Sequence, residues 1–271
     1  MEKVIIVTGA SSGIGLTVSK YLADKGHHVY GISRSKTHEK NIKSIQADVT
    51  NIDQMIKAYQ EIFDIEGRID VLINNAGIGI SGSIEDTKTE DVLDLLHVNF
   101  MGVFHSTKVA LPFMRKTRQG KIINISSVAS VLSIPFQAFY SSSKAAINAF
   151  SSALSNEVEP FGIDVCVIMP GDIKTSFTKN RRKNDIANPH YEKRINKSVA
   201  VMEKDEQNGM DPEVLAKVVE KLIRKKRMPL YKTIGFKYKV FVFLEKVLPR
   251  GLTNQVVGKI YGFKKGKKKN D

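Results

Sequence analysis

A tyrosine and a lysine four residues apart are the first residues in this sequence whose types could do proton chemistry. Tyr140 and Lys144 enclose three serines in FYSSSKAAINAF, where a helix is predicted to begin near Gln137. A free phenol has a pKa of about 10, and a nearby cation favours its ionised form. Four residues along a helix rise about 6 Å and place both side chains on one face. We therefore expect Lys144 to lower the pKa of Tyr140, so that the phenol can act as a general acid or base.

The spacing alone does not select this pair. Two further Tyr-x-x-x-Lys matches occur, Tyr21 with Lys25 and Tyr261 with Lys265. Composition predicts about one match by chance. The choice among the three pairs depends on the elements that position them.

A glycine-rich stretch, VTGASSGIG, follows the first apolar run and opens an amphipathic stretch. Gly9, Gly13 and Gly15 allow a sharp turn and a close approach of the backbone to a pyrophosphate. The helix that follows would offer free N–H groups and the positive end of its dipole to phosphates. An ordinary glycine-rich turn is the alternative, but the strand-loop-helix context favours a dinucleotide site.

Short β-branched runs alternate with longer amphipathic stretches through residues 1–170. Such alternation is typical of crossover units, so we predict an α/β fold with a doubly wound parallel sheet and helices on both faces. No linker or repeat divides the chain, and residues 1–235 are predicted to form one domain with MPLYKTIG as its last strand. The polar residues 174–210 show no periodic pattern, and we expect a functional or mobile substrate loop there. Residues 236–271 are predicted to be an amphipathic helical extension with a polybasic tail.

Composition excludes several classes of protein. The sequence shows no signal-peptide pattern and no apolar run long enough to span a membrane, as expected of a soluble, cytoplasmic protein. Cys166 is the one cysteine, so no internal disulfide is possible, and its apolar surroundings predict a buried thiol. The histidines lack metal-ligand spacing, and no metal is expected. The adjacent His27 and His28 would point to opposite faces of a strand.

The net charge of +14 is concentrated in the last third of the chain. Residues 1–173 carry 16 Lys and Arg against 18 Asp and Glu, whereas residues 174–271 carry 26 against 10. A basic region can face an anionic ligand, nucleic acid or an acidic membrane, but no nucleic-acid recognition module is present and none is expected as a partner. Within the basic region, the run Arg181-Arg182-Lys183 could favour a substrate with a carboxylate or phosphate. A solvated charge run is the favoured interpretation.

Four motifs, in this order, resemble the short-chain dehydrogenase/reductase family: Thr8-Gly9-x-x-x-Gly13-Ile14-Gly15, Asn74-Asn75-Ala76-Gly77, Ser127 with Tyr140-x-x-x-Lys144, and Pro170-Gly171. The resemblance covers about residues 3–225 and implies a Rossmann-like sheet of about seven strands, with a nicotinamide cofactor at the carboxyl ends of the strands. Members of this family place a catalytic serine thirteen residues before the tyrosine. That step leads from Tyr140 to Ser127, but from Tyr21 to Thr8 and from Tyr261 to Leu248.

The resemblance also implies roles for the catalytic residues. Ser127 would hold the substrate oxygen, Tyr140 would pass the proton, and Lys144 would bind the nicotinamide ribose. Asn99 matches the fourth catalytic position of the family, in a water-linked proton relay to Lys144. A structural polar residue in a helix is the alternative for Asn99.

A larger set is expected to bind the cofactor: Gly9, Ser11, Ser12, Gly13, Ile14, Gly15, Ser33, Arg34, Asp48, Val49, Asn75, Ala76, Gly77, Tyr140, Lys144, Pro170, Gly171, Ile173 and Thr175. Asn74 is expected to pair buried backbone groups between strands. Asp48 would lie near the adenine ring, with a turn-forming acid as the alternative.

The end of the second strand bears on the choice of nicotinamide. NAD enzymes carry a carboxylate there, whereas Ser33 and Arg34 stand at that place here. An arginine can bind the additional phosphate of NADP through two hydrogen bonds. We therefore expect NADP(H) to be preferred over NAD(H), with a solvated loop charge as the alternative for Arg34.

Together these features predict an NADP(H)-dependent oxidoreductase that interconverts a carbonyl and a secondary alcohol and forms a homodimer or homotetramer. The C-terminus resembles retinol and hydroxysteroid dehydrogenase-like members, which implies a hydrophobic or lipid-like substrate. The alternatives are a 3-oxoacyl-thioester reductase, a non-catalytic dinucleotide-binding regulator and a membrane-surface scaffold.

The apolar and basic C-terminal extension has two interpretations. With the run KKGKKK, it could lie on an anionic membrane as a peripheral contact. Alternatively, Phe241, Leu244 and Val247 could cover the substrate cleft or a subunit interface, with the lysine run as a solvated terminus.

Overall fold

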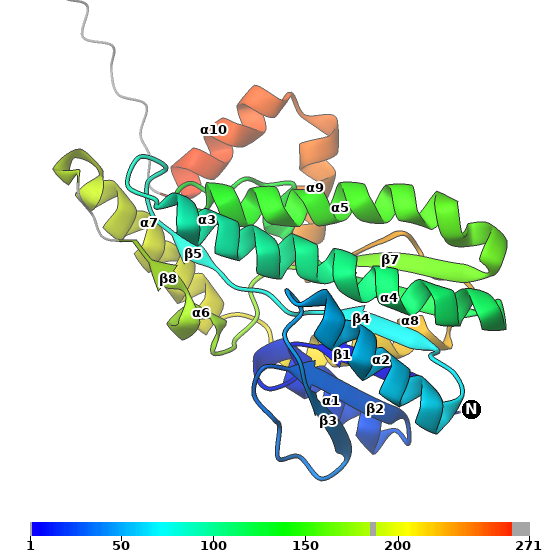
Figure 1. Ribbon diagram of the computed structural model, residues 1–271. Helices are drawn as coiled ribbons and strands as arrows, with labels where there is room; N and C mark the ends of the chain where they lie inside the picture. The colour runs from blue at the N-terminus through cyan, green and yellow to red at the C-terminus, as the bar shows by residue number, and fades with distance from the viewer. Residues whose placement is uncertain (1, 185–187, 262–271) are drawn as a thin grey trace, which may run out of the picture.

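A parallel sheet with the strand order β3-β2-β1-β4-β6-β7-β9 forms the centre of the molecule (Figure 1). The computed structural model describes residues 2–184 and 188–261. The strands of this sheet are β1 (Val4–Thr8), β2 (His28–Ser33), β3 (Ile42–Gln46), β4 (Val71–Asn74), β6 (Gly120–Ile125), β7 (Ile163–Pro170) and β9 (Tyr231–Ile234). The doubly wound, Rossmann-like α/β fold with seven strands is thereby confirmed.

Helices cover both faces of the sheet and extend beyond it. They are α1 (Gly13–Asp24), α2 (Ile52–Glu66), α3 (Thr89–Leu96), α4 (Gly102–Thr117), α5 (Ala138–Val158), α6 (Phe177–Asn180), α7 (Pro189–Gln207), α8 (Pro212–Arg224), α9 (Phe236–Val247) and α10 (Arg250–Ile260). Shorter elements are a π-helix η1 (His97–Met101), the 3₁₀ turns η2 (Val128–Ser130) and η3 (Glu159–Phe161), and a second small sheet of β5 (Ile80–Ser81) and β8 (Arg182–Lys183).

Alternate side chains of the strands feed two separate hydrophobic layers. In β1, Val4 and Ile6 belong to the layer under α2, α4 and α5, whereas Ile5 and Val7 belong to the layer under α1 and α8. Strands buried on both faces read as continuous apolar runs, which explains the VIIV of the first strand. Cys166 lies fully buried in the second layer, where burial raises the pKa of its thiol to about 12. This confirms the prediction of a buried thiol.

The connection from β7 to α8 has more structure than its sequence suggests. The prediction that residues 174–210 lack a pattern is wrong, because Pro189–Gln207 form the helix α7. Asn188 caps this helix and Pro189 occupies its first turn, while Ile195, Val199 and Met202 supply one buried face. In Figure 1, α6, β8 and α7 lie on the side of the sheet opposite the N-terminus.

Two backbone pairings anchor this connection. At its base, Ile173 forms a parallel bridge with Met210. Further out, β8 pairs with β5, and Ile80 lies opposite Arg182. The connection is therefore held both at its ends and at its middle.

The C-terminal extension consists of α9 and α10, with Leu248 and Pro249 between them. In Figure 1, where they are coloured orange to red, α10 lies above α5 and α9 passes behind it. Val242 of α9 is buried against Val167 and Met169 of β7. The expected polybasic tail falls at residues 262–271, outside the described residues.

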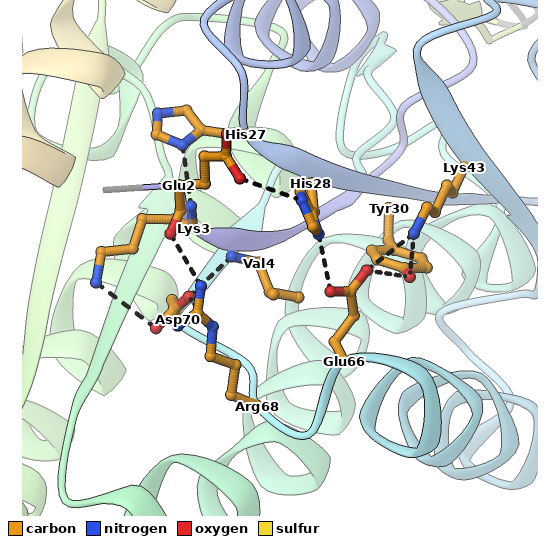
Figure 2. A network of polar contacts seen from close by, with 10 residues as sticks. All are labelled: Glu2, Lys3, Val4, His27, His28, Tyr30, Lys43, Glu66, Arg68 and Asp70. Carbon is orange, nitrogen blue, oxygen red and sulfur yellow. Dashed lines mark hydrogen bonds and ion pairs between the residues drawn. The ribbon is translucent and has the colours of Figure 1, made fainter.

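Ionic contacts join the amino ends of the strands, away from the cleft described below (Figure 2). Glu66, in the last turn of α2, accepts hydrogen bonds from Tyr30, Lys43 and His28 at 2.7 to 2.8 Å. His27 contacts Glu220 of α8 on the other face. The prediction that the two histidines point to opposite faces is confirmed. Burial alone would raise the pKa of Glu66, but the hydrogen bonds from Lys43, Tyr30 and His28 outweigh it and lower that pKa to about 2.

Glu66→Gln is expected to reduce the loss of unfolding free energy that accompanies a fall in pH. A carboxylate whose pKa is depressed on folding contributes stability above its ordinary pKa, and this contribution is lost as the pH falls from about 4.5 towards 2. Because the network is open to solvent, we expect a loss of about 1 kcal/mol at neutral pH. Urea titrations between these pH values, compared with Glu61→Gln on the same helix, measure the effect. An identical pH dependence in both variants would contradict it.

Candidate active site

A cavity of about 700 Å³ lies at the carboxyl ends of the parallel strands, where doubly wound sheets bind ligands. The sequence-predicted site residues line it, with two exceptions, Gly15 and Asn99. Gly15 is buried behind the glycine loop, and Asn99 lies fully buried beneath the cavity floor. The sheet thus gathers residues that are up to about 160 positions apart in the chain at one edge.

The glycine loop between β1 and α1 is shaped to approach an anion. Gly13 has a φ of 53°, in the left-handed region that favours glycine, and a Cβ on Gly15 would lie 2.2 Å from the carbonyl oxygen of Gly9. Ser12 caps α1 without a side-chain hydrogen bond, and the first turn of α1 carries no acidic residue. Free N–H groups at the positive end of this helix therefore face the cavity, an arrangement that fits the pyrophosphate of a dinucleotide.

The second motif holds this loop in place, but through a different asparagine from the one expected. Asn75 donates from its side chain to the carbonyls of Thr8 and Gly9 at 3.0 and 3.2 Å. Asn74 instead donates to the side chains of Thr107 and Asn124. The prediction that Asn74 pairs backbone groups is wrong, because its side chain points into the helix layer, and Asn75 has that role.

Strand β6 and helix α5 position the candidate catalytic residues. Ser127 follows β6 and caps η2, accepting from the Ala129 N–H at 3.1 Å. Tyr140 and Lys144 lie on adjacent turns at the start of α5, with the Lys144 Nζ 5.7 Å from the centre of the Tyr140 ring. The Ser127 hydroxyl lies close enough to the Tyr140 phenol to lower its pKa. The structure therefore brings the three residues together as the sequence predicts.

The expected effect of Lys144 on Tyr140 does not appear in this structure. Burial is the largest influence on the phenol and raises its pKa to about 12, despite the opposing effect of Ser127. Lys144 does not counter this, since its Nζ lies over the ring and donates to the Ile125 carbonyl at 2.9 Å. The prediction that Lys144 lowers this pKa is wrong. At neutral pH Tyr140 carries its proton, as a proton donor requires.

Lys144 is itself strongly affected by its position. It is buried, and loss of hydration lowers its pKa to about 8. The amine thus keeps its charge at neutral pH and loses it in mild alkali. A Cβ on Gly77 would lie 3.6 Å from the Lys144 Nζ and 3.3 Å from the Asn99 Oδ1, so both groups converge on the backbone of this glycine.

Asn99 lies in the π-helical turn η1 between α3 and α4. Such turns are rare and occur often at functional sites. Its side chain accepts from the Ile78 N–H at 2.8 Å and donates to the Ile78 carbonyl and to Ser143. Asn99 therefore fixes the strand end beside Gly77 and contacts α5 one residue before Lys144. Its part in a water-linked relay stays a prediction.

The cofactor end of the cavity is formed by β2 and β3. Arg34 is exposed at the cavity rim directly after β2, and Ser33 donates to the Ser35 carbonyl at 2.7 Å. No carboxylate occupies the strand end. Asp48 lines the cavity and also accepts from the N–H and hydroxyl of Thr50, as a turn-forming acid does. Its place near the adenine ring stays a prediction.

The C-terminal helices supply a wall of the cavity, which was one of the two interpretations of this extension. They add a group of mainly apolar residues to the cavity: Lys237, Tyr238, Phe241, Val257, Ile260 and Tyr261. Phe241 covers the cleft, as one interpretation predicted, whereas Leu244 and Val247 are exposed. Tyr21 of α1, by contrast, packs against the core and does not line the cavity. Apolar spacing in α9 and α10 was the available signal for this wall.

A polar group from α6 and α7 completes the cavity. Arg181 is only 5% exposed and forms an ion pair with Glu206, so the interpretation of the basic run as solvated is wrong for this residue. Phe177 lies between Arg181 and Tyr140. Asp172 accepts from the Tyr238 hydroxyl. These pairings depend on tertiary contacts, and sequence spacing gives no signal for them.

A glycine loop that leads into a helix N-terminus, beside the group of Ser127, Tyr140 and Lys144, defines a nucleotide-binding oxidoreductase that acts on CH–OH groups. A family model described as short chain dehydrogenase matches residues 3–186, and the chain belongs to this family. Its members depend on NAD or NADP.

Three similar proteins illustrate this relationship. A 3-ketodihydrosphingosine reductase of Bacteroides thetaiotaomicron is 42% identical over 236 residues, which cover 86% of this chain and 88% of the relative. A short-chain dehydrogenase structure from Streptomyces avermitilis has a TM-score of 0.82 at 28% identity, covering 96% of this chain and 94% of that chain. The structure of ElxO with NADP bound has a TM-score of 0.74 at 27% identity, covering 89% and 100%.

Proposed function

We propose that this protein uses NADPH to reduce a ketone on a long, lipid-like chain. One observation carries the proposal: the cavity that holds Ser127, Tyr140 and Lys144 continues into the apolar wall of α9 and α10. An alkyl chain placed against this wall would have its ketone within reach of the catalytic residues. The similarity to a 3-ketodihydrosphingosine reductase supports the same substrate class.

In this proposal the residues of the chain bind, orient and protonate the substrate. The nicotinamide, when bound, supplies the hydride. Ser127 holds the carbonyl oxygen against the Tyr140 hydroxyl, and Tyr140 donates the proton that completes the alcohol. Lys144, still charged at neutral pH, anchors the ribose and stabilises the Tyr140 phenolate that forms when the proton is donated. Asn99 holds the backbone beside Gly77 against α5 through its hydrogen bonds to Ile78 and Ser143.

A preference for NADP(H) rests on the end of β2. Arg34 is free to bind a phosphate, since no ion pair within residues 2–184 and 188–261 involves it. A carboxylate there would repel that phosphate, and Ser33 stands in its place. The NADP-bound relative with the same fold is consistent with this choice.

Turnover of NADPH with a ketone panel tests the function directly. The panel contains 3-ketodihydrosphingosine, 3-octadecanone and acetoacetyl-coenzyme A. We expect oxidation of NADPH with the long-chain ketones and little with the thioester. A preference for the thioester would favour the 3-oxoacyl reductase alternative, and cofactor binding without turnover of any ketone would favour a regulatory protein.

We also propose that the outer face of α9 and α10 contacts an anionic membrane, from which a lipid substrate could reach the cavity. The described residues contain no helix long and apolar enough to cross a bilayer. On α9, however, Phe236, Phe243 and Val247 are 83%, 62% and 58% exposed. Basic side chains accompany them along the two helices: Lys237, Lys239, Lys246, Arg250 and Lys259. Apolar residues among basic ones suit a helix that lies in the interface of an anionic bilayer.

Replacing both Phe243 and Val247 with serine is expected to weaken vesicle binding by about tenfold or more, because each apolar side chain contributes about 1.5 to 3 kcal/mol when buried. Flotation with phosphatidylcholine vesicles, with and without phosphatidylglycerol, measures the effect. Ile56→Ser with Ile65→Ser removes two similarly exposed side chains from α2 and serves as the control. Equal binding by the two double variants would contradict this contact.

The family is typically oligomeric, and we propose a homodimer or homotetramer for this chain as well. Light scattering after size-exclusion chromatography distinguishes these assemblies from a monomer.

A further inference from the structure

The polar end of the cavity contains a buried arginine whose hydrogen-bonding capacity is only partly used. The Arg181 Nη2 donates to Glu206, which also accepts from the Thr178 hydroxyl at 2.6 Å. Among the described residues, the Arg181 Nε and Nη1 have no partner, although both atoms are buried. A buried donor without an acceptor costs about 1 to 3 kcal/mol. A ligand oxygen in the cavity could satisfy these groups.

This arginine lies one aromatic ring away from the proton donor. The Phe177 ring centre is 5.8 Å from the Tyr140 ring centre, and the Arg181 guanidinium carbon is also 5.8 Å from the Phe177 ring centre. A Cβ on Gly79 would meet both Phe177 and Arg181, so the backbone just before β5 packs directly against these two side chains. Tyr140, Phe177 and Arg181 therefore form a short continuous row along the cavity. A group bonded to the carbon beside a carbonyl held at Tyr140 would be within reach of these residues.

The same end of the cavity carries two carboxylates that no ion pair among the described residues neutralises. Asp172, Asp205 and Glu206 line it, and Asp172 and Glu206 act on Tyr140 through their charges. Arg181 pairs with Glu206, and Lys237 lies over the rings of Tyr238 and Phe241. Arg182 also lines this end but pairs with Asp91 and Asp94 of α3. Asp172 and Asp205 therefore keep charges that no ion pair among the described residues neutralises, and these attract a cationic group and repel an anionic one.

We propose that this end of the cavity recognises a ketone with a protonated amine on the neighbouring carbon and a hydroxyl beyond it. Asp172 and Asp205 supply the opposite charge for the amine, and the free N–H groups of Arg181 donate to the hydroxyl oxygen. This inference rests on the proposed function and names the head group of its substrate. An acyl thioester, whose coenzyme carries phosphates, is disfavoured by the same carboxylates.

A pair of substrates tests the recognition of the amine in the unaltered protein. 3-Ketodihydrosphingosine carries the amine, and its N-acetyl derivative has the same skeleton without the charge. We expect kcat/KM with NADPH to be about 100-fold higher for the amine, because a site built to pair a polar group discriminates against analogues that leave it unpaired. Equal kcat/KM values for the two ketones would overturn the inference while leaving the proposed function intact. Failure to reduce either ketone would instead count against the proposed function.

Two variants assign this selectivity to the named residues. Asp172→Asn keeps a hydrogen-bonding group beside Tyr238 but removes the charge, and we expect it to reduce the preference for the amine by about tenfold. Arg181→Lys keeps the charge but lacks the fixed fork of donors, and we expect a higher KM for both ketones with unchanged NADPH affinity. Glu203→Gln on α7 removes a carboxylate outside the cavity and serves as the control for Asp172→Asn. An undiminished preference in Asp172→Asn would overturn the role of that carboxylate.

Discussion

Tyr140→Phe is expected to lower kcat for ketone reduction by about 1,000-fold, the range in which positioned acids and bases contribute. The substitution removes only the hydroxyl that Ser127 contacts and leaves the ring packed near Phe177. NADPH affinity is therefore expected to change by less than about threefold. Stopped-flow reduction at saturating NADPH, together with a fluorescence titration of the cofactor, separates the chemical step from binding.

A matched control exists in the same chain. Tyr21→Phe removes the hydroxyl of another tyrosine followed four residues later by a lysine, but its ring packs against the core outside the cavity. We expect this variant to keep the unaltered kcat. If the two variants lost activity to the same extent, or if Tyr140→Phe kept its activity, Tyr140 would not be the proton donor.

Arg34→Ala has the second large expected effect, which is on the choice of cofactor. Charge-assisted hydrogen bonds contribute about 1.5 to 3 kcal/mol, so the ratio of kcat/KM for NADPH to that for NADH should fall by about 10-fold to 100-fold. The loss should appear almost entirely with NADPH, because NADH carries no phosphate at that position. Steady-state kinetics with each cofactor at a fixed ketone concentration measure the ratio.

Lys36→Ala controls for a general loss of positive charge. Lys36 is exposed two residues after Arg34 and does not line the cavity. We expect its cofactor ratio to be unchanged. A ratio that falls equally in both variants would indicate long-range attraction of the cofactor, and no fall in either would show that Arg34 does not recognise the phosphate.

The fold and the centre of the site are predictable because their signals are local. Buried parallel strands give continuous apolar runs, and the glycine loop sits at the junction of β1 and α1. Tyr140 and Lys144 share one helix, so their spacing alone predicts their proximity. Ser127 becomes predictable once the resemblance fixes its distance from Tyr140 along the chain.

The rest of the site depends on contacts between distant segments. Arg181 belongs to a run of charges that reads as exposed, yet the packing of Phe177 and Glu206 buries it. Helix α7 is mostly polar, so its single buried face of Ile195, Val199 and Met202 gives only a weak periodic signal.

The pKa of Tyr140 likewise cannot be predicted from residue spacing. Four residues of separation predict that Lys144 lies nearby, but they do not give the burial of the phenol or the bond between Lys144 and the Ile125 carbonyl. Burial and these partners determine the direction of the shift.

The pH dependence of the reaction in both directions tests most directly whether Tyr140 transfers the proton. Reduction needs the protonated phenol, so its kcat/KM should be constant near neutral pH. It should fall about tenfold per pH unit above the pKa of the Tyr140 phenol. Oxidation of the alcohol product needs the ionised phenol and should rise with pH through the same pKa. The residual activity of Tyr140→Phe should lack both trends. Reduction that quickens as the pH rises, or identical profiles in the two proteins, would contradict the assignment.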